Sequence, residues 1–153
     1  MSGPPGSDED PLSASGLEAA AQMVPARSPA RAALTLARSA EMSGAPKEVV
    51  VALLAPLVRA VADLAGPART PCRPMGGEPA GPLTDEERRG MREMACAMAV
   101  TALRLAGSVL SGGFAACAVL LYQARTMQEC DQALGWMRGA VEAWLEETGR
   151  PPL

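Results

Sequence analysis

The stretch from Leu105 to Tyr122 contains eighteen residues and no charged side chain, and it constrains the fold more than any other feature. A helix that crosses a bilayer needs about twenty predominantly apolar residues. Ser108, Ser111, Gly112 and Gly113 interrupt the first half of this stretch, so we expect a break near Ser111. A shorter helix that is apolar on every face is typically buried at the centre of a bundle. We therefore expect a central core helix at residues 111–123, with a membrane segment as the alternative.

The remainder of the chain predicts an all-α fold. Aromatic residues make up only 3% of the 153 residues, and no segment alternates polar and apolar side chains as a half-buried strand would. A chain of this length normally forms one domain. We expect a disordered tail at 1–14 and a single helical domain at 15–150, with a flexible Pro- and Gly-rich loop at 66–83. The domain should contain about six or seven helices.

Local signals predict where these helices begin and end. Ser15 and Glu18, and again Thr84 and Glu87, have the spacing of an N-terminal capping box. Pro56 should kink or split the helix that contains it, because proline lacks an N–H and clashes with the preceding turn. The last helix should face the core with one stripe of side chains at alternating spacings of three and four: Met127, Cys130, Leu134, Met137, Val141 and Trp144.

Charge and side-chain chemistry argue against several functions. The net charge is −3, Lys47 is the only lysine, and the arginines are scattered, so the basic stripe of a nucleic-acid-binding protein is missing. The chain has no histidine, and its cysteines lack CxxC spacing, so we expect no metal and no cofactor. Buried, reduced thiols would suit an intracellular protein. An enzyme is not expected, because the carboxylates Glu87, Glu93 and Asp131 form no recognisable catalytic pair.

The segment LTLARSAEM, residues 34–42, contains a leucine, three further residues, a small residue and an acid. Leu36, Ala40 and Glu41 take those places. Leu36 and Ala40 would share one face of a helix, and the small side chain would allow another helix to approach closely.

A second segment, SGGF, precedes the apolar run of the central helix. Its residues are Ser111, Gly112, Gly113 and Phe114. Gly113 would let a partner helix pack against bare backbone, and Ser111 could cap the helix.

A third segment, WLEETG, contains a tryptophan, an aliphatic residue, a polar pair, one more residue and a glycine: Trp144, Leu145, Glu146, Glu147, Thr148 and Gly149. Taken in order, the three segments resemble the third, first and second homology motifs of the Bcl-2 family of apoptosis regulators. The tryptophan and arginine of the first motif are replaced here by Gly112 and Phe114. The last pair of the second motif is replaced by Arg150 and Pro151.

The resemblance implies a Bcl-2-like helical bundle around a central hydrophobic helix. A groove in its surface would capture the death-motif helix of pro-apoptotic Bcl-2 proteins and so inhibit cell death. The divergence, compact length and alanine content are more similar to a viral relative than to a cellular member. Such a protein would act in the host cytoplasm or at mitochondria. The family usually carries a C-terminal membrane anchor, and we expect none here, because the chain ends in RPPL.

By position, six residues would form the groove: Val50, Leu54, Met94, Met98, Gly113 and Phe114. Gly113 should be the most sensitive of them, because the small residue of the bound helix must approach the backbone there. Phe114 stands where the family has the arginine that pairs with the acid of the bound helix, and Arg104 lies beyond a helix break. We therefore expect binding through apolar anchors to a narrow subset of partners, such as Bim. The alternative is a self-associating helical protein without a groove, and a homodimer is compatible with both hypotheses.

Overall fold

The computed structural model describes residues 10–65, 82–106 and 108–149. These residues form seven α-helices and no strand, which confirms the expected all-helical class. The helices are α2 (Ala14–Ala21), α3 (Pro29–Met42), α4 (Lys47–Leu53), α5 (Ala55–Ala65), α6 (Asp85–Arg104), α7 (Val109–Gln123) and α8 (Met127–Glu147). Most of the loop expected at 66–83 lies outside the described residues. Within the described part of the chain, no helix is long and apolar enough to cross a membrane.

The N-terminal cap of α2 is not the serine that the sequence suggested. Ser13, and not Ser15, occupies the cap position, and the backbone N–H of Gly16 donates to its hydroxyl oxygen at 3.1 Å. The expected tail at 1–14 also ends earlier, because Leu12 is already buried in the core. Residues 1–9 lie outside the described residues.

The expected signals at Thr84 and Pro56 agree with the structure. Thr84 caps α6 through a complete capping box: the Glu87 N–H donates to the Thr84 hydroxyl at 3.1 Å, and the Thr84 N–H donates to the Glu87 carboxylate at 3.0 Å. The helix expected around Pro56 is split in two, since α4 ends at Leu53 and α5 begins at Ala55. This break places Pro56 in the first turn of α5, where a missing N–H has no helical partner to lose.

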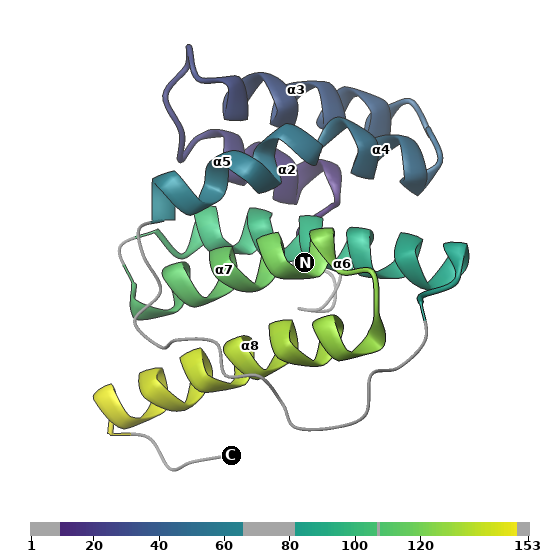
Figure 1. The fold of residues 1–153 in the computed structure, drawn as a ribbon. Helices are drawn as coiled ribbons and strands as arrows, with labels where there is room; N and C mark the ends of the chain where they lie inside the picture. The colour runs from purple at the N-terminus through teal and green to yellow at the C-terminus, as the bar shows by residue number, and fades with distance from the viewer. Residues whose placement is uncertain (1–9, 66–81, 107, 150–153) are drawn as a thin grey trace, which may run out of the picture.

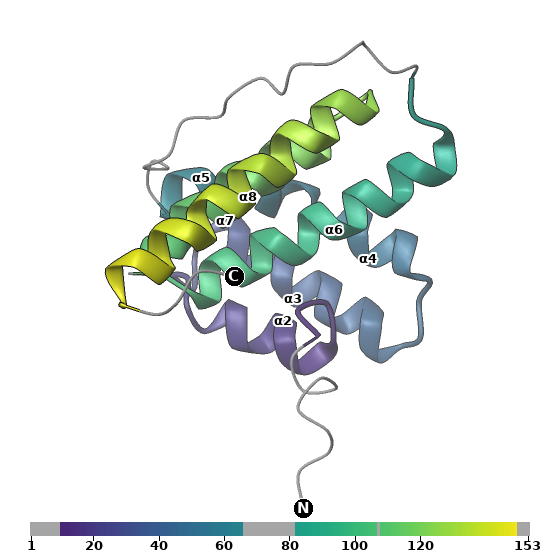
Figure 2. The same ribbon diagram turned by 90° about the horizontal axis from the view of Figure 1, so that it is seen from below.

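The helices pack in three layers (Figure 1). Helices α2 to α5 form the first layer, α6 and α7 lie side by side in the second, and α8 covers α7 from the opposite side. The view from below shows α8 in front of α7 (Figure 2). Helix α7 thus contacts α5, α6 and α8, as expected for a helix without a polar face.

The central helix begins two residues earlier than expected, at Val109. Ser111 is therefore not its cap. It lies inside the first turn, is only 1% exposed, and its hydroxyl donates to the carbonyl of Ala102 at 2.8 Å. Ala102 belongs to the last turn of α6, where carbonyl groups lack helical partners. This hydrogen bond thus gives a partner both to the buried hydroxyl of Ser111 and to a carbonyl group in the last turn of α6.

Helix α8 approaches α7 through small side chains. Gly113 of α7 faces Ala140 of α8 so closely that a Cβ atom on Gly113 would overlap the Cβ of Ala140. The buried residues of α8 include Cys130, Ala133 and Ala140, whereas Leu134 is 42% exposed. The expected stripe is therefore wrong at Leu134, because alanines permit the close approach and the larger side chains lie at the edge of the contact.

We predict that Gly113→Ala destabilises the fold. The overlap with Ala140 should cost about 1 to 3 kcal/mol, which exceeds the gain of at most about 1 kcal/mol in helix propensity. The free energy of unfolding, measured by urea denaturation followed by circular dichroism, should fall by about 1 to 2 kcal/mol.

Gly90 provides the matched control, because it lies inside α6 and a Cβ added there meets no atom within 4 Å. Gly90→Ala should raise the free energy of unfolding by about 0.5 to 1 kcal/mol. Adding Ala140→Gly to Gly113→Ala should recover part of the lost stability. If the effects of Gly113→Ala and Ala140→Gly on the free energy of unfolding were strictly additive, α7 and α8 would not meet at these two positions.

Candidate functional site

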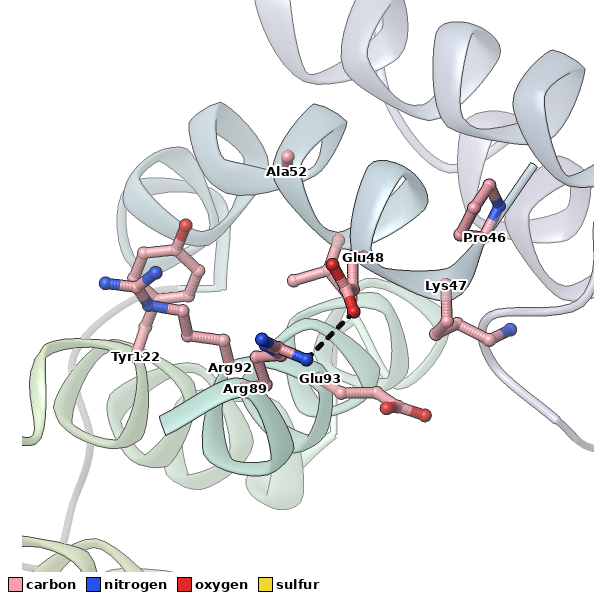
Figure 3. A pocket seen from close by; sticks show the side chains of 9 residues that line it. Pro46, Lys47, Glu48, Ala52, Arg89, Arg92, Glu93 and Tyr122 are labelled. Carbon is pink, nitrogen blue, oxygen red and sulfur yellow. Dashed lines mark hydrogen bonds and ion pairs between the residues drawn. The ribbon is translucent and has the colours of Figure 1, made fainter. Parts of the chain in front are cut away.

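A pocket of about 480 Å³ opens between α4 and α6 and is closed at one end by the aromatic ring of Tyr122 from α7 (Figure 3). Its volume lies within the range of about 300 to 1,000 Å³ that is usual for ligand sites. Apolar and charged side chains both line it: Pro46, Lys47, Glu48, Val51, Ala52, Arg89, Arg92, Glu93 and Tyr122.

Charged side chains from both helices lie at the pocket. Glu48 of α4 and Arg89 of α6 form an ion pair across the gap, with 3.1 Å between the carboxylate oxygen and the guanidinium nitrogen. Both side chains are well exposed, so this pair contributes little to stability and can open at small cost. At the other side of the pocket, Lys47 pairs with Glu41 of α3 at 3.5 Å.

The closed end of the pocket is formed by a cation–π contact. The guanidinium carbon of Arg92 lies 5.5 Å from the centre of the Tyr122 ring. Figure 3 shows the two side chains together at one end of the pocket, away from Lys47 and Pro46. Such a contact is worth roughly 0.5 to 1 kcal/mol at an exposed site. It also fixes the direction of Arg92, which is half-buried.

Beneath the pocket, a thiol connects its two walls. Cys96 of α6 is buried, and its thiol donates to the backbone carbonyl of Val51 in α4, with 3.7 Å between sulfur and oxygen. Burial, with a smaller contribution from the negative charge of Glu93, raises the pKa of this thiol from 9.0 to about 12. The group is therefore a protonated packing element and not a nucleophile at neutral pH.

A second pocket of about 280 Å³ adjoins the first and shares Arg92 and Tyr122 with it. It lies between α5, α6 and the C-terminal end of α7. The residues that line it are Val58, Arg59, Arg88, Arg92, Val119, Tyr122, Gln123 and Arg125.

The six residues expected to form the groove do not come together at either pocket. Val50 and Leu54 are 0% exposed and belong to the main core, so they are closed to a partner in this conformation. Met94 is 42% exposed on α6. Met98 packs against both core clusters and accepts a hydrogen bond from the Cys117 thiol at 3.1 Å.

The two expected groove residues on α7 also point into the molecule. Phe114 is half-buried and packs against the main core. Gly113 is buried against Ala140 of α8, so its bare backbone is used by a helix of the same chain. Gly113 therefore cannot report on partner binding without also changing the packing of α7 on α8.

The remaining motif residues are spread over the molecule. Leu36 is 57% exposed on α3, whereas Ala40 packs against the core, so the two do not share one buried face. Glu41 forms the ion pair with Lys47 described above. Trp144 is half-buried near the end of α8, and Gly149 follows that helix with a positive φ of 69°.

Four residues that matter most at the pockets were not expected there: Val51, Arg89, Arg92 and Tyr122. One sequence signal was present, because Arg88 and Arg92 are separated by four residues and must lie on one face of α6. Nothing in the sequence indicates that Tyr122 would meet this face, since the contact depends on how α7 packs on α6.

The acidic and thiol groups considered for chemistry lie apart. Glu87 is the capping-box residue, Glu93 borders the first pocket, and Asp131 is exposed on α8. Cys96, Cys117 and Cys130 are buried thiols, as expected, and Cys72 lies outside the described residues. In the described ranges, no three acidic or thiol side chains form a group that could hold a metal ion.

We predict that Cys96 makes the fold sensitive to alkaline pH. The folded thiol keeps its proton up to a pKa of about 12, whereas the unfolded thiol loses it near 9.0. Stability is thus fully present below about pH 9 and decreases as the pH rises towards 12, by at most about 1.4 kcal/mol per pH unit. Urea denaturation at several pH values should show a shallower alkaline decrease for Cys96→Ala, and an equal slope in both proteins would contradict this assignment.

The chain was compared with known protein families, curated proteins and solved structures, and none of them matches it.

Proposed function

We propose that this protein is a helical binding module that captures an amphipathic helix of a partner in the pocket between α4 and α6. The pocket is the observation that carries the proposal: it combines an apolar lining, from Val51, Ala52 and Tyr122, with charged side chains of both signs. A captured helix offers the matching pattern, with apolar anchors at i, i+3 or i+4 and i+7 and polar residues beside them.

The dimensions of the first pocket support this kind of ligand. Anchors at i and i+7 of a helix are separated by about 10 Å along its axis. The first pocket alone has a volume of about 480 Å³, and the second continues it past Arg92 and Tyr122. The first pocket can therefore accept apolar side chains from one helix, while the backbone of that helix stays at the surface.

The resemblance to the Bcl-2 family gives the more specific form of the proposal. The ligand would be the death-motif helix of pro-apoptotic Bcl-2 proteins, bound by a Bcl-2-like bundle around α7, and the biological effect would be inhibition of apoptosis. The protein would be a viral homologue that acts in the host cytoplasm or at mitochondria on a narrow subset of partners such as Bim. The order of the motif segments on α3, α7 and α8 supports this form.

The position of the site is tested by Ala52→Glu. Ala52 is exposed and lines the first pocket only, so a carboxylate there should leave the fold intact but place a negative charge among the apolar anchors and beside the arginines that would receive the acid of the ligand. Fluorescence anisotropy with a labelled death-motif peptide should show at least about tenfold weaker binding than the parent. Ala32→Glu, on an exposed position of α3 outside both pockets, is the matched control and should bind as the parent does.

Failure can be read in two ways. Equal affinity of the parent and Ala52→Glu would move the site away from this pocket. No binding of any death-motif peptide, together with concentration-dependent size in sedimentation velocity, would instead favour the self-associating protein.

The charge of the ligand provides a separate prediction. Phe114 cannot pair with an acid, but Arg89 and Arg92 line the first pocket. Replacing the acid of the bound peptide by alanine should therefore weaken binding by about tenfold or more, as for a charge-assisted contact. An unchanged affinity would show that apolar anchors alone hold the peptide.

A further inference from the structure

The second pocket collects four arginines from three separate parts of the chain. Arg88 and Arg92 lie four residues apart on α6, Arg59 belongs to α5, and Arg125 follows the end of α7. The whole chain has only 14 basic residues and a net charge of −3. Four positive charges at one pocket are therefore a local excess in a chain that is negative as a whole.

Nothing in the lining of this pocket compensates these charges. Among the described residues that line it, the uncharged ones are two valines, Tyr122 and Gln123, and none is acidic. The ion pairs of the described residues use other cations: Arg38, Lys47, Arg89 and Arg138. Guanidinium groups stay protonated at every physiological pH, so they cannot relieve their mutual repulsion by losing protons. A bound anion would relieve it.

The number of arginines indicates the class of anion. A carboxylate offers two oxygens and one charge, which one guanidinium can satisfy with a bidentate pair. A phosphate group carries a charge of about −1.5 to −2 at neutral pH and three acceptor oxygens, so it can engage several guanidinium groups at once. Tyr122 and Gln123 add a hydroxyl and an amide that can donate to further oxygens.

The size of the pocket agrees with a group of this kind. A volume of about 280 Å³ corresponds to the space of about nine water molecules, at about 30 Å³ each. That space holds a phosphate or pyrophosphate group but no helix. The contact of Arg92 with Tyr122, at 5.5 Å, keeps one guanidinium directed before a ligand arrives.

We propose that the second pocket binds the phosphate group of a soluble phosphate compound or of a lipid headgroup. This inference does not depend on the proposed capture of a helix, because Arg59, Arg88 and Arg125 line only the second pocket.

Isothermal titration calorimetry of the full chain with sodium pyrophosphate, at constant ionic strength, tests the proposal. The parent should bind, and Arg88→Gln/Arg125→Gln should bind at least about tenfold more weakly, because each guanidinium donates charge-assisted hydrogen bonds. The matched control is Arg27→Gln/Arg104→Gln, which removes the same charge from exposed positions outside the pocket and should bind almost as the parent does. Arg59→Gln, on a different helix, should weaken binding in the same direction as the first pair.

Vesicle sedimentation distinguishes the two sources of phosphate. Phosphatidylcholine vesicles, with and without phosphatidylinositol 4,5-bisphosphate, are mixed with the parent and both double variants. Arginine-dependent binding of pyrophosphate alone assigns a soluble ligand, and arginine-dependent binding to the phosphoinositide vesicles assigns a headgroup. The proposal is overturned if the parent binds neither probe, or if the control pair loses as much binding as the pocket pair.

Discussion

The absence of a polar face on α7 governs the arrangement of the other helices. From Val109 to Gln123 this helix has no charged side chain, so every side that remained in water would expose apolar surface. Helix α5 covers it from the first layer, α6 lies beside it in the second layer, and α8 covers it from the opposite side. The contact with α8 is close because it is made at Gly113 and Ala140, and among the described helices α7 is the main partner of α8.

The two pockets lie where this constraint ends. Tyr122 is near the last turn of α7, and Arg125 is the first charged residue after the apolar stretch. At this end the helix no longer needs complete cover, and helices α4, α5 and α6 present arginines and carboxylates to the space that remains. Polar groups near the end of a buried helix are less costly than polar groups at its middle, because water can still reach them.

How far the sequence predicts the structure depends on how local each interaction is. The capping box at Thr84 and the break at Pro56 were predictable, because both depend on residues within one turn of helix. The cap of α2 was expected at Ser15 but lies at Ser13, because two nearby serines can both take this role. Val50 and Leu54 were expected in a groove from their position in the chain, but they are buried in the core, and this outcome depends on which face of α4 meets the core. The spacing of Arg88 and Arg92 on α6 was visible in the sequence, but the meeting of these arginines with Arg59 of α5 and Arg125 after α7 depends on tertiary packing.

Gly113 shows why a short motif is weak evidence for a binding residue. A glycine in a helix allows any helix to approach its backbone, whether it belongs to a partner or to the same chain. Here Ala140 of α8 already occupies that position, so the packing of α8 is sufficient to require the glycine. The unfilled space beside Arg92 and Tyr122 therefore supports a binding function better than the glycine motif does. Because these two side chains border both pockets, a ligand that repositions Arg92 in one pocket must change the charge and shape of the other, and binding at the two would be reciprocally coupled.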